Sequence, residues 1–228
     1  MQWIDNSPVG FSPSKIICVG RNYREHAIEL GNAVPESPLL FLKPPSAIQC
    51  VENSVWVPTQ HGPVSYECEI ALLIGKTLTH VTAEEAKTAI IGVTLALDFT
   101  LRDLQNELKK QGYPWEKAKA FDGACALNTW VPWSDKYVEL NLGFFCAGQK
   151  KQEGSSSQMM WPIAKLIAEA SKWFTLQPGD VILTGTPEGV GLMPEGEVQW
   201  KLSIKNKDSE INVHEWSAIC RKNRDSML

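Results

Sequence analysis

Long apolar runs are missing from this sequence. Nothing in its 228 residues approaches the roughly 18 uninterrupted apolar residues that a membrane-spanning helix requires. The N-terminus, MQWIDNSPVG, also lacks the basic region and following apolar stretch of a secretion signal. We therefore expect a cytoplasmic protein that has no membrane partner.

Positive charge is not in excess either. The chain has 22 Lys and Arg residues against 26 Asp and Glu residues, which gives a net charge of -4. It also contains no basic patch with interleaved aromatic residues. Nucleic acid is therefore not an expected partner, and neither is an anionic membrane.

Several short binding motifs are absent. The six cysteines are scattered, without a CxxC pair or the CxxC and HxxxH spacing of a zinc site, so we expect reduced core residues. The segment LTGTPEGVG (183–191) lacks the Gly-Lys ending of a P-loop and the GxGxxG spacing of a dinucleotide site. This loop is either a structural turn or a loop whose backbone closes on a small anion.

Short β-like runs dominate the rest of the chain. Hydrophobic residues form 43% of it and charged residues 21%, as in an ordinary globular protein, and we expect one domain over 1–228 with an N-terminal extension at 1–14. Breaks containing Pro or Gly separate several of the runs, which favours a sheet-rich fold with antiparallel or mixed pairing. We expect strands at 15–19, 39–42, 69–74, 90–98, 181–183, 197–206 and 211–219.

Three helices are predicted between these strands. They follow a Thr82 cap, run from a Thr100 cap to Gly112, and cover about 161–174. In the first, Glu85 occupies the third helical position, as a capping box requires. In the second, Lys109 and Lys110 lie near the negative end of the helix dipole.

Three acidic residues suggest a metal site. Glu67 and Glu69 stand two residues apart in the strand segment YECEIALLIGK (66–76), so both carboxylates face one side and need a shared cation or a shared proton. Asp98 follows a largely apolar segment that begins at Ala89. An oxygen-only ligand set suits Mg²⁺, Mn²⁺ or Ca²⁺ better than zinc. A divalent-metal site is our hypothesis, and a solvated sheet face is the alternative.

His26 and Glu29 are candidates for proton transfer. They stand three residues apart in GRNYREHAIELG (20–31), so on a helix the carboxylate could orient the imidazole and raise its basicity. An exposed helix surface is the alternative. His61 is a second candidate base, with the same alternative.

Lys119 is a candidate for anion binding. It lies in PWEKAKAFDGA (114–124), an awkward stretch for a helix, where a partly buried ammonium could pair with an anionic ligand. A surface lysine is the alternative. Arg102 and Gln105 lie one or two helical turns beyond Asp98 and are expected near whatever that carboxylate holds.

Seven motifs taken together resemble the fumarylacetoacetate hydrolase family, in its short single-domain branch of acylpyruvate hydrolases and oxaloacetate decarboxylases or tautomerases. In chain order they are GRNYREH, LLFLKP, YECEIALLIGK, LDFTLRDLQ, KAFD, QEG and LQPGDVILTGTPEGVG, from about residue 15 to 211. The resemblance implies an α+β fold, a mixed β-roll with flanking helices, and a homodimer.

The resemblance also implies roles for individual residues. It makes Glu67, Glu69 and Asp98 the ligands of Mg²⁺, with Mn²⁺ or Ca²⁺ as alternatives. Catalytic roles fall to His26 and Glu29, which match the pair that activates water in the hydrolases, and to the active-site lysine, Lys119. Substrate-binding roles fall to Arg21, Lys43, Gln105 and Thr186.

The implied activity is metal-dependent hydrolysis of a carbon-carbon bond in acylpyruvate-type 2,4-diketo acids, through an enolate that the metal stabilises. Alternatives are an oxaloacetate decarboxylase or tautomerase, an isomerase of 2-hydroxy unsaturated diacids from aromatic catabolism, and a non-catalytic β module with a structural metal. The longer hydrolases of the family carry an additional acid at the metal, which this chain does not show. Fumarylacetoacetate itself is therefore not the expected substrate.

Overall fold

An eight-stranded mixed sheet carries the predicted acidic residues. The computed structural model describes residues 1–31, 33 and 35–222. The strands of this sheet follow the spatial order β2 (Leu39–Lys43), β1 (Ile16–Gly20), β12 (Val181–Leu183), β6 (Cys68–Ile74), β7 (Ile90–Asp98), β8 (Cys125–Leu127) and β3 (Ile48–Cys50), and β9 (Val131–Pro132) also pairs with β7. β1 and β12 are parallel, as are β3 and β8, and the other pairs are antiparallel.

The central strands β6 and β7 are largely apolar on both faces, apart from the acids Glu69 and Asp98. Every residue of β6 is buried, and β7 is buried along nearly its whole length. Strands with this composition are buried between two layers, because neither face offers polar groups to water. Their register pairs Glu69 with Ala96, and the Asp98 amide donates to the Glu67 carbonyl at 2.8 Å. The two strands therefore bring the three predicted acids to one end of the sheet.

A five-stranded sheet packs against this layer. Its strands follow the order β11 (Gln149–Ser155), β10 (Tyr137–Cys146), β14 (Gly196–Asn206), β15 (Ile211–Lys222) and β4 (Ser54–Val57), and β5 (Ser65–Tyr66) pairs separately with β13 (Gly191–Leu192). In β14 alternate residues are buried, among them Val198, Trp200 and Leu202, so the strand turns one apolar face to the core. The larger of the two core clusters includes residues of both sheets. The expected mixed β-roll is confirmed.

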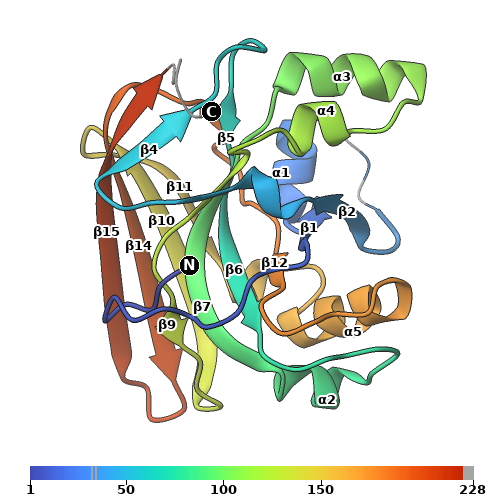
Figure 1. The fold of residues 1–228 in the computed structure, drawn as a ribbon, viewed down its shortest axis with the longest axis vertical. Coiled ribbons are helices and arrows are strands. Elements are labelled where there is room, and N and C mark those ends of the chain that lie inside the picture. Colours follow the sequence, from blue (N-terminus) through green and yellow to red (C-terminus); the bar gives the residue numbers. More distant parts are fainter. Residues whose placement is uncertain (32, 34, 223–228) are drawn as a thin grey trace.

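Helices lie along the opposite side of the molecule from the five-stranded sheet (Figure 1). They are α1 (Arg24–Glu29), α2 (Ala83–Lys87), α3 (Arg102–Gln111), α4 (Glu116–Lys119) and α5 (Ile163–Trp173), with short 3-10 turns at Pro45–Ala47 and Ser156–Gln158. Among the described residues, no helix is long and apolar enough to cross a membrane. The six cysteines of the sequence all lie in the described part of the chain, where each is free and all but Cys50 are buried.

Helix starts show where local prediction works and where it fails. The capping box at Thr82 and Glu85 is confirmed. The Thr100 cap is wrong, because α3 begins at Arg102 after Leu101, and the Thr100 hydroxyl accepts a hydrogen bond from the Lys119 ammonium at 2.7 Å. A buried ammonium gains more from that oxygen than a helix end does, since the helix end can also be solvated.

The N-terminal segment 1–14 contacts the smaller core cluster. Trp3 forms a parallel bridge with Trp130, and Gln2 pairs with Pro8. Val9 is buried in that cluster, on the face of the eight-stranded sheet that turns away from the other sheet. The segment predicted as an extension therefore covers part of this face.

Candidate active site

Three carboxylates converge at one end of the central strands. Glu67 lies between β5 and β6, Glu69 lies on β6, and Asp98 ends β7. One oxygen from each lies within 4.8 Å of the others, and the three residues are only 5%, 2% and 1% exposed. The two-residue spacing on the strand and the neighbouring strand end thus produce the predicted cluster.

Two of these acids are paired with cations. The Lys119 ammonium lies 2.7 Å from Oε2 of Glu67 and 2.8 Å from Oδ2 of Asp98, and Arg102 forms an ion pair with Oε1 of Glu67. Burial alone would raise the pKa of Glu67, but Lys119 and Arg102 outweigh burial and hold it below its usual value. Burial alone would lower the pKa of Lys119, but Asp98 and Glu67 raise it. Lys119 is therefore a buried, charged residue rather than a surface lysine.

Glu69 has no such partner. Its Oε2 accepts a hydrogen bond from the Gly185 amide at 2.6 Å, and no salt bridge reaches it from any residue that the structure describes. Burial raises its pKa well above the ordinary value, and repulsion from Asp98 and Glu67 adds to this. A buried carboxylate without a cation is costly. Because the donor set is oxygen-only and one acid lacks a counter-charge, the cluster fits a divalent metal ion.

The loop after β12 holds Glu69 in place. Gly185 adopts φ 97°, and a Cβ there would lie 2.8 Å from the Cβ of Asn22, so only glycine fits this turn. The Thr186 hydroxyl donates to the Cys68 carbonyl at 2.9 Å and accepts from Gln152 at 2.8 Å. Thr186 lines the cavity, but its hydroxyl bonds to the protein itself.

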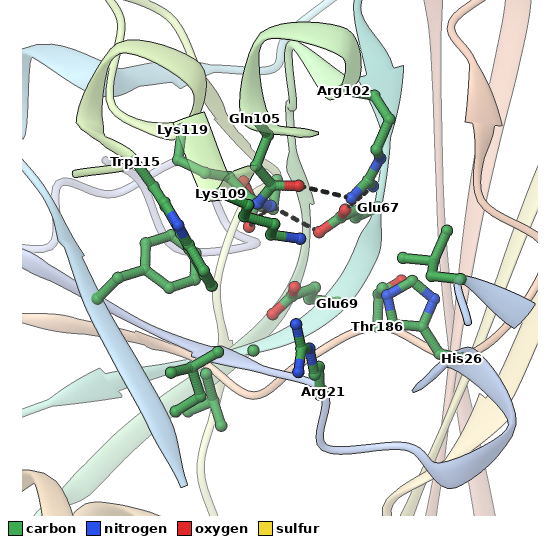
Figure 2. A pocket seen from close by; sticks show the side chains of 16 residues that line it. Arg21, His26, Glu67, Glu69, Arg102, Gln105, Lys109, Trp115, Lys119 and Thr186 are labelled. Carbon is green, nitrogen blue, oxygen red and sulfur yellow. Dashed lines mark hydrogen bonds and ion pairs between the residues drawn. The ribbon is translucent and has the colours of Figure 1, made fainter. Parts of the chain in front are cut away.

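His26 and Glu29 meet as predicted from their spacing. On α1, Nδ1 of His26 lies 3.4 Å from Oε2 of Glu29, and the Glu29 carboxylate also accepts from the Gly189 amide at 3.1 Å. His26 is 5% exposed and lines the cavity (Figure 2). Burial lowers its pKa, although Glu67 and Glu29 act in the opposite direction. The imidazole is therefore neutral at neutral pH and can accept a proton.

The remaining predicted residues separate into two groups. Arg21 and Gln105 line the cavity. Lys43 does not line it: its buried ammonium lies behind the acids, 2.8 Å from Oδ1 of Asp98, and also donates to the Lys119 carbonyl. His61 is exposed in a turn away from the cavity. Lys43 of β2 is therefore placed as a buried counter-charge to Asp98, and a substrate-binding role for it stays a prediction.

One side of α3 adds Lys109, a functional candidate that sequence reasoning missed, to the predicted Arg102 and Gln105. Arg102, Gln105 and Lys109 stand at positions i, i+3 and i+7, and all three line the cavity (Figure 2). From the sequence, Lys109 is expected to interact only with the helix dipole. The seven-residue spacing from Arg102 is the signal that could have placed it on the same face. Trp115, just before α4, also lines the cavity.

Comparisons with known proteins agree with this geometry. The family described as "Fumarylacetoacetate (FAA) hydrolase C-terminal" matches residues 15–216. Oxaloacetate tautomerase YcgM of Escherichia coli (strain K12) is 46% identical over 187 residues, which are 81% of this chain and 85% of that protein.

Solved structures extend the similarity to the whole fold. A protein of Oleispira antarctica, named as a candidate fumarylacetoacetate isomerase/hydrolase, superposes with a TM-score of 0.90 and 42% identity, covering 97% of this chain and 99% of that one. A fumarylpyruvate hydrolase from Pseudomonas aeruginosa, solved in complex with Mn²⁺ and pyruvate, gives a TM-score of 0.78 and 30% identity, covering 92% and 91%.

Proposed function

We propose that this chain, which belongs to the fumarylacetoacetate hydrolase family, is a divalent-metal-dependent tautomerase that interconverts the enol and keto forms of oxaloacetate. The similarity to oxaloacetate tautomerase YcgM favours this reaction, and the observation that carries the choice of a dianionic substrate is the charge of the cavity. Among the described residues, four cationic side chains and three carboxylates line it, a surplus of one positive charge that a divalent ion would raise to three. Such a cavity favours a dianion such as oxaloacetate over a monoanion such as acetylpyruvate.

The three acids would hold the metal. Glu67, Glu69 and Asp98 supply oxygen ligands suited to Mg²⁺ or Mn²⁺, and Mn²⁺ is the ion named in the fumarylpyruvate hydrolase structure. When bound, the ion supplies Lewis-acid stabilisation of the negative charge that develops on the 2-keto oxygen.

Residues beside the acids would orient the keto acid. The Gln105 carbonyl oxygen accepts a hydrogen bond from Arg102 at 2.9 Å, so the Gln105 amide N–H groups are available to a substrate oxygen. The Lys119 ammonium adds a fixed positive charge beside them, and it acts on the substrate through that charge, because its three N–H groups donate to Glu67, Asp98 and Thr100.

His26 would move the proton. Tautomerisation transfers one proton from the enol oxygen to C3, and a neutral imidazole can accept it and then return it to carbon. Because Glu29 engages Nδ1, the Nε2 atom is the one available for this transfer. The Gly189 amide fixes Glu29 in turn. Glu29 thus holds the base in position. The reaction needs no external proton donor, because the proton taken from the enol oxygen is the one returned to C3.

Acylpyruvate hydrolysis is the second candidate. The same His26–Glu29 pair could take a proton from water, which would then attack the distal carbonyl of a 2,4-diketo acid. The fumarylpyruvate hydrolase neighbour supports this possibility. The charge surplus favours a diacid in this reaction as well.

A direct assay separates the candidates. Purified protein is incubated with Mg²⁺, Mn²⁺ or a chelator, and then with enol-oxaloacetate, acetylpyruvate or fumarylpyruvate. We expect metal-dependent loss of the enol absorbance well above the spontaneous rate. Cleavage of an acylpyruvate without acceleration of the enol–keto exchange would establish the second candidate instead, and the absence of both activities would refute the metal-dependent keto-acid assignment.

A further inference from the structure

Two cationic side chains reach the same cavity from different parts of the chain. Lys109 lies in the last turn of α3, and Arg21 directly follows β1. Both line the cavity that contains the three acids, and Figure 2 shows both side chains pointing into it. We call Lys109 and Arg21 the distal pair.

The protein positions both members of the distal pair. The Lys109 ammonium lies over the Trp115 ring, 5.0 Å from its centroid, which directs the long side chain along the cavity wall. Arg21 has φ 58°, a backbone conformation that non-glycine residues rarely adopt. Its Nη1 donates to the Ala33 carbonyl at 3.3 Å. Strained backbone of this kind clusters at ligand sites, because surrounding structure has to maintain it.

Lys109 has no anionic partner within the described part of the chain. No carboxylate there lies within salt-bridge distance of its ammonium, whereas Lys119 on the neighbouring helix contacts two. Half-burial, and after it the neighbouring cations led by Arg21, lower the pKa of Lys109 to about 8. Like charges gathered in a cavity need an anion to offset their repulsion.

We propose that the distal pair binds the second carboxylate of a dicarboxylate substrate, and that it thereby selects 2-keto diacids over 2-keto monoacids. The keto-acid end would occupy the side of the cavity formed by the metal site, Gln105 and Lys119, and the far carboxylate would lie between Lys109 and Arg21. This inference rests on the proposed function for the choice of oxaloacetate as ligand, but not for the presence of an anion subsite.

Kinetics with a matched pair of substrates test the proposal. Lys109→Met removes the charge and keeps an unbranched apolar side chain. We expect KM for oxaloacetate to rise about 10- to 100-fold, the equivalent of one charge-assisted hydrogen bond, while KM for the 4-methyl ester of oxaloacetate changes less than about twofold. Lys110→Met is the control, because Lys110 is exposed on the same helix. Arg21→Gln is expected to reproduce the selective loss.

A binding measurement keeps this test independent of turnover. Calorimetry in the presence of Mg²⁺ compares 3,3-difluoro-oxaloacetate, which cannot enolise, with its 4-methyl ester. We expect wild type to prefer the diacid and Lys109→Met to lose the preference, with oxalate affinity and melting temperature unchanged. If enol-oxaloacetate is not converted but this preference is present and lost in Lys109→Met, the proposed reaction is wrong and the subsite stands.

Three outcomes overturn the proposal. One is an equal loss of affinity for diacid and ester in Lys109→Met, which would mean that Lys109 contacts the shared keto-acid end. Another is an unchanged affinity for the diacid. The third is a loss of the same size in Lys110→Met, which would reflect the overall field of the helix and not a contact.

Discussion

Two lysines that line the cavity hold their charge in opposite ways. Lys119 lies within 2.8 Å of two carboxylates, which outweigh its burial and raise its pKa. Half-burial, and after it the nearby cations Arg21, Arg102 and Lys119, lower the pKa of Lys109 to about 8, although Glu67 acts in the opposite direction. The two lysines are ten residues apart in the sequence, yet within the described part of the chain only Lys119 has an anionic partner.

This difference distinguishes charged side chains that are paired within the protein from charged side chains that have no ion-pair partner among the described residues. Lys119 offsets the cost of burying Glu67 and Asp98, and the protein folds with that pairing complete. Glu69 and Lys109 lack such offsets among the described residues, and each therefore indicates a missing ligand of the opposite sign. These two unpaired groups are the basis on which we propose a cation beside Glu69 and an anion beside Lys109.

Removing the unpaired acid is expected to have the largest effect. Glu69→Gln keeps the acceptor for the Gly185 amide but removes a charged metal ligand, so we expect turnover to fall to the uncatalysed rate. Without metal, the variant is expected to be more stable than wild type by about 1 kcal/mol or more at neutral pH, because wild type has to protonate or bury the Glu69 carboxylate on folding and glutamine does not. Thermal melts with and without Mg²⁺, together with the enol assay, measure both effects. Near wild-type turnover with Mg²⁺ would contradict the metal role.

Removing the base is expected to change rate and not affinity. His26→Ala is expected to lower kcat for oxaloacetate tautomerisation by about 10²- to 10⁴-fold, the usual contribution of a general acid–base residue. Oxalate binding in the presence of Mg²⁺ is expected to stay within about threefold of wild type, since no metal ligand changes. Steady-state kinetics and calorimetry check the two parts. A large loss of oxalate affinity would instead make His26 a binding residue.

The pKa of Lys109 predicts a pH effect of intermediate size. Lys109 is charged below its pKa of about 8 and neutral above it. Above this pH the cavity therefore holds one positive charge fewer. We expect kcat/KM for oxaloacetate to fall about tenfold between pH 7 and pH 9, because the far carboxylate loses one charged donor. The 4-methyl ester is expected to lack this decline. In Lys109→Met, kcat/KM is expected to show no such decline for either substrate. A decline that persists in this variant would mean that another group titrates.

The smallest effect is expected at the loop that positions Glu69. Gly185→Ala places a Cβ against Asn22 at a φ of 97°, so we expect a loss of about 1–3 kcal/mol in unfolding free energy and weaker Mg²⁺ binding. Gly148→Ala is the control, because Gly148 also has positive φ (73°) but a Cβ there would meet no atom of the described chain within 4 Å. Denaturant titration and Mg²⁺ titration measure the two effects. Equal metal affinity in both variants would exclude a role for this loop at the metal site.

Strands and acidic residues were predictable because their signals are local. Continuous apolar runs marked β6 and β7, and alternate positions along a strand share a face, so Glu67 and Glu69 had to project together. His26 and Glu29 were predictable for the same reason, since residues three apart on a helix are neighbours. The capping box at Thr82 is also local, and it is confirmed.

Predictions failed where side chains from distant segments compete for one another. The Thr100 hydroxyl accepts a hydrogen bond from Lys119 and does not cap the helix. Lys43 likewise lies against Asp98 and does not line the cavity, although this does not test its predicted role. In both places a polar side chain contacts a buried charge. A buried charge without a polar partner costs more free energy than an exposed group without one. No spacing rule along the chain encodes that competition.

By itself, the order of residues predicted a sheet-rich fold, two glutamates on one strand face and a His–Glu pair on one helix face, since periodicity is a property of each element alone. Only the packing of α3 and the segment after β1 around the end of the sheet decided that Lys109 and Arg21 share a cavity with those acids. The physical reason is that burial and the distance between charges set whether a lysine is paired, solvated or left for a ligand, and both are known only once the elements have packed.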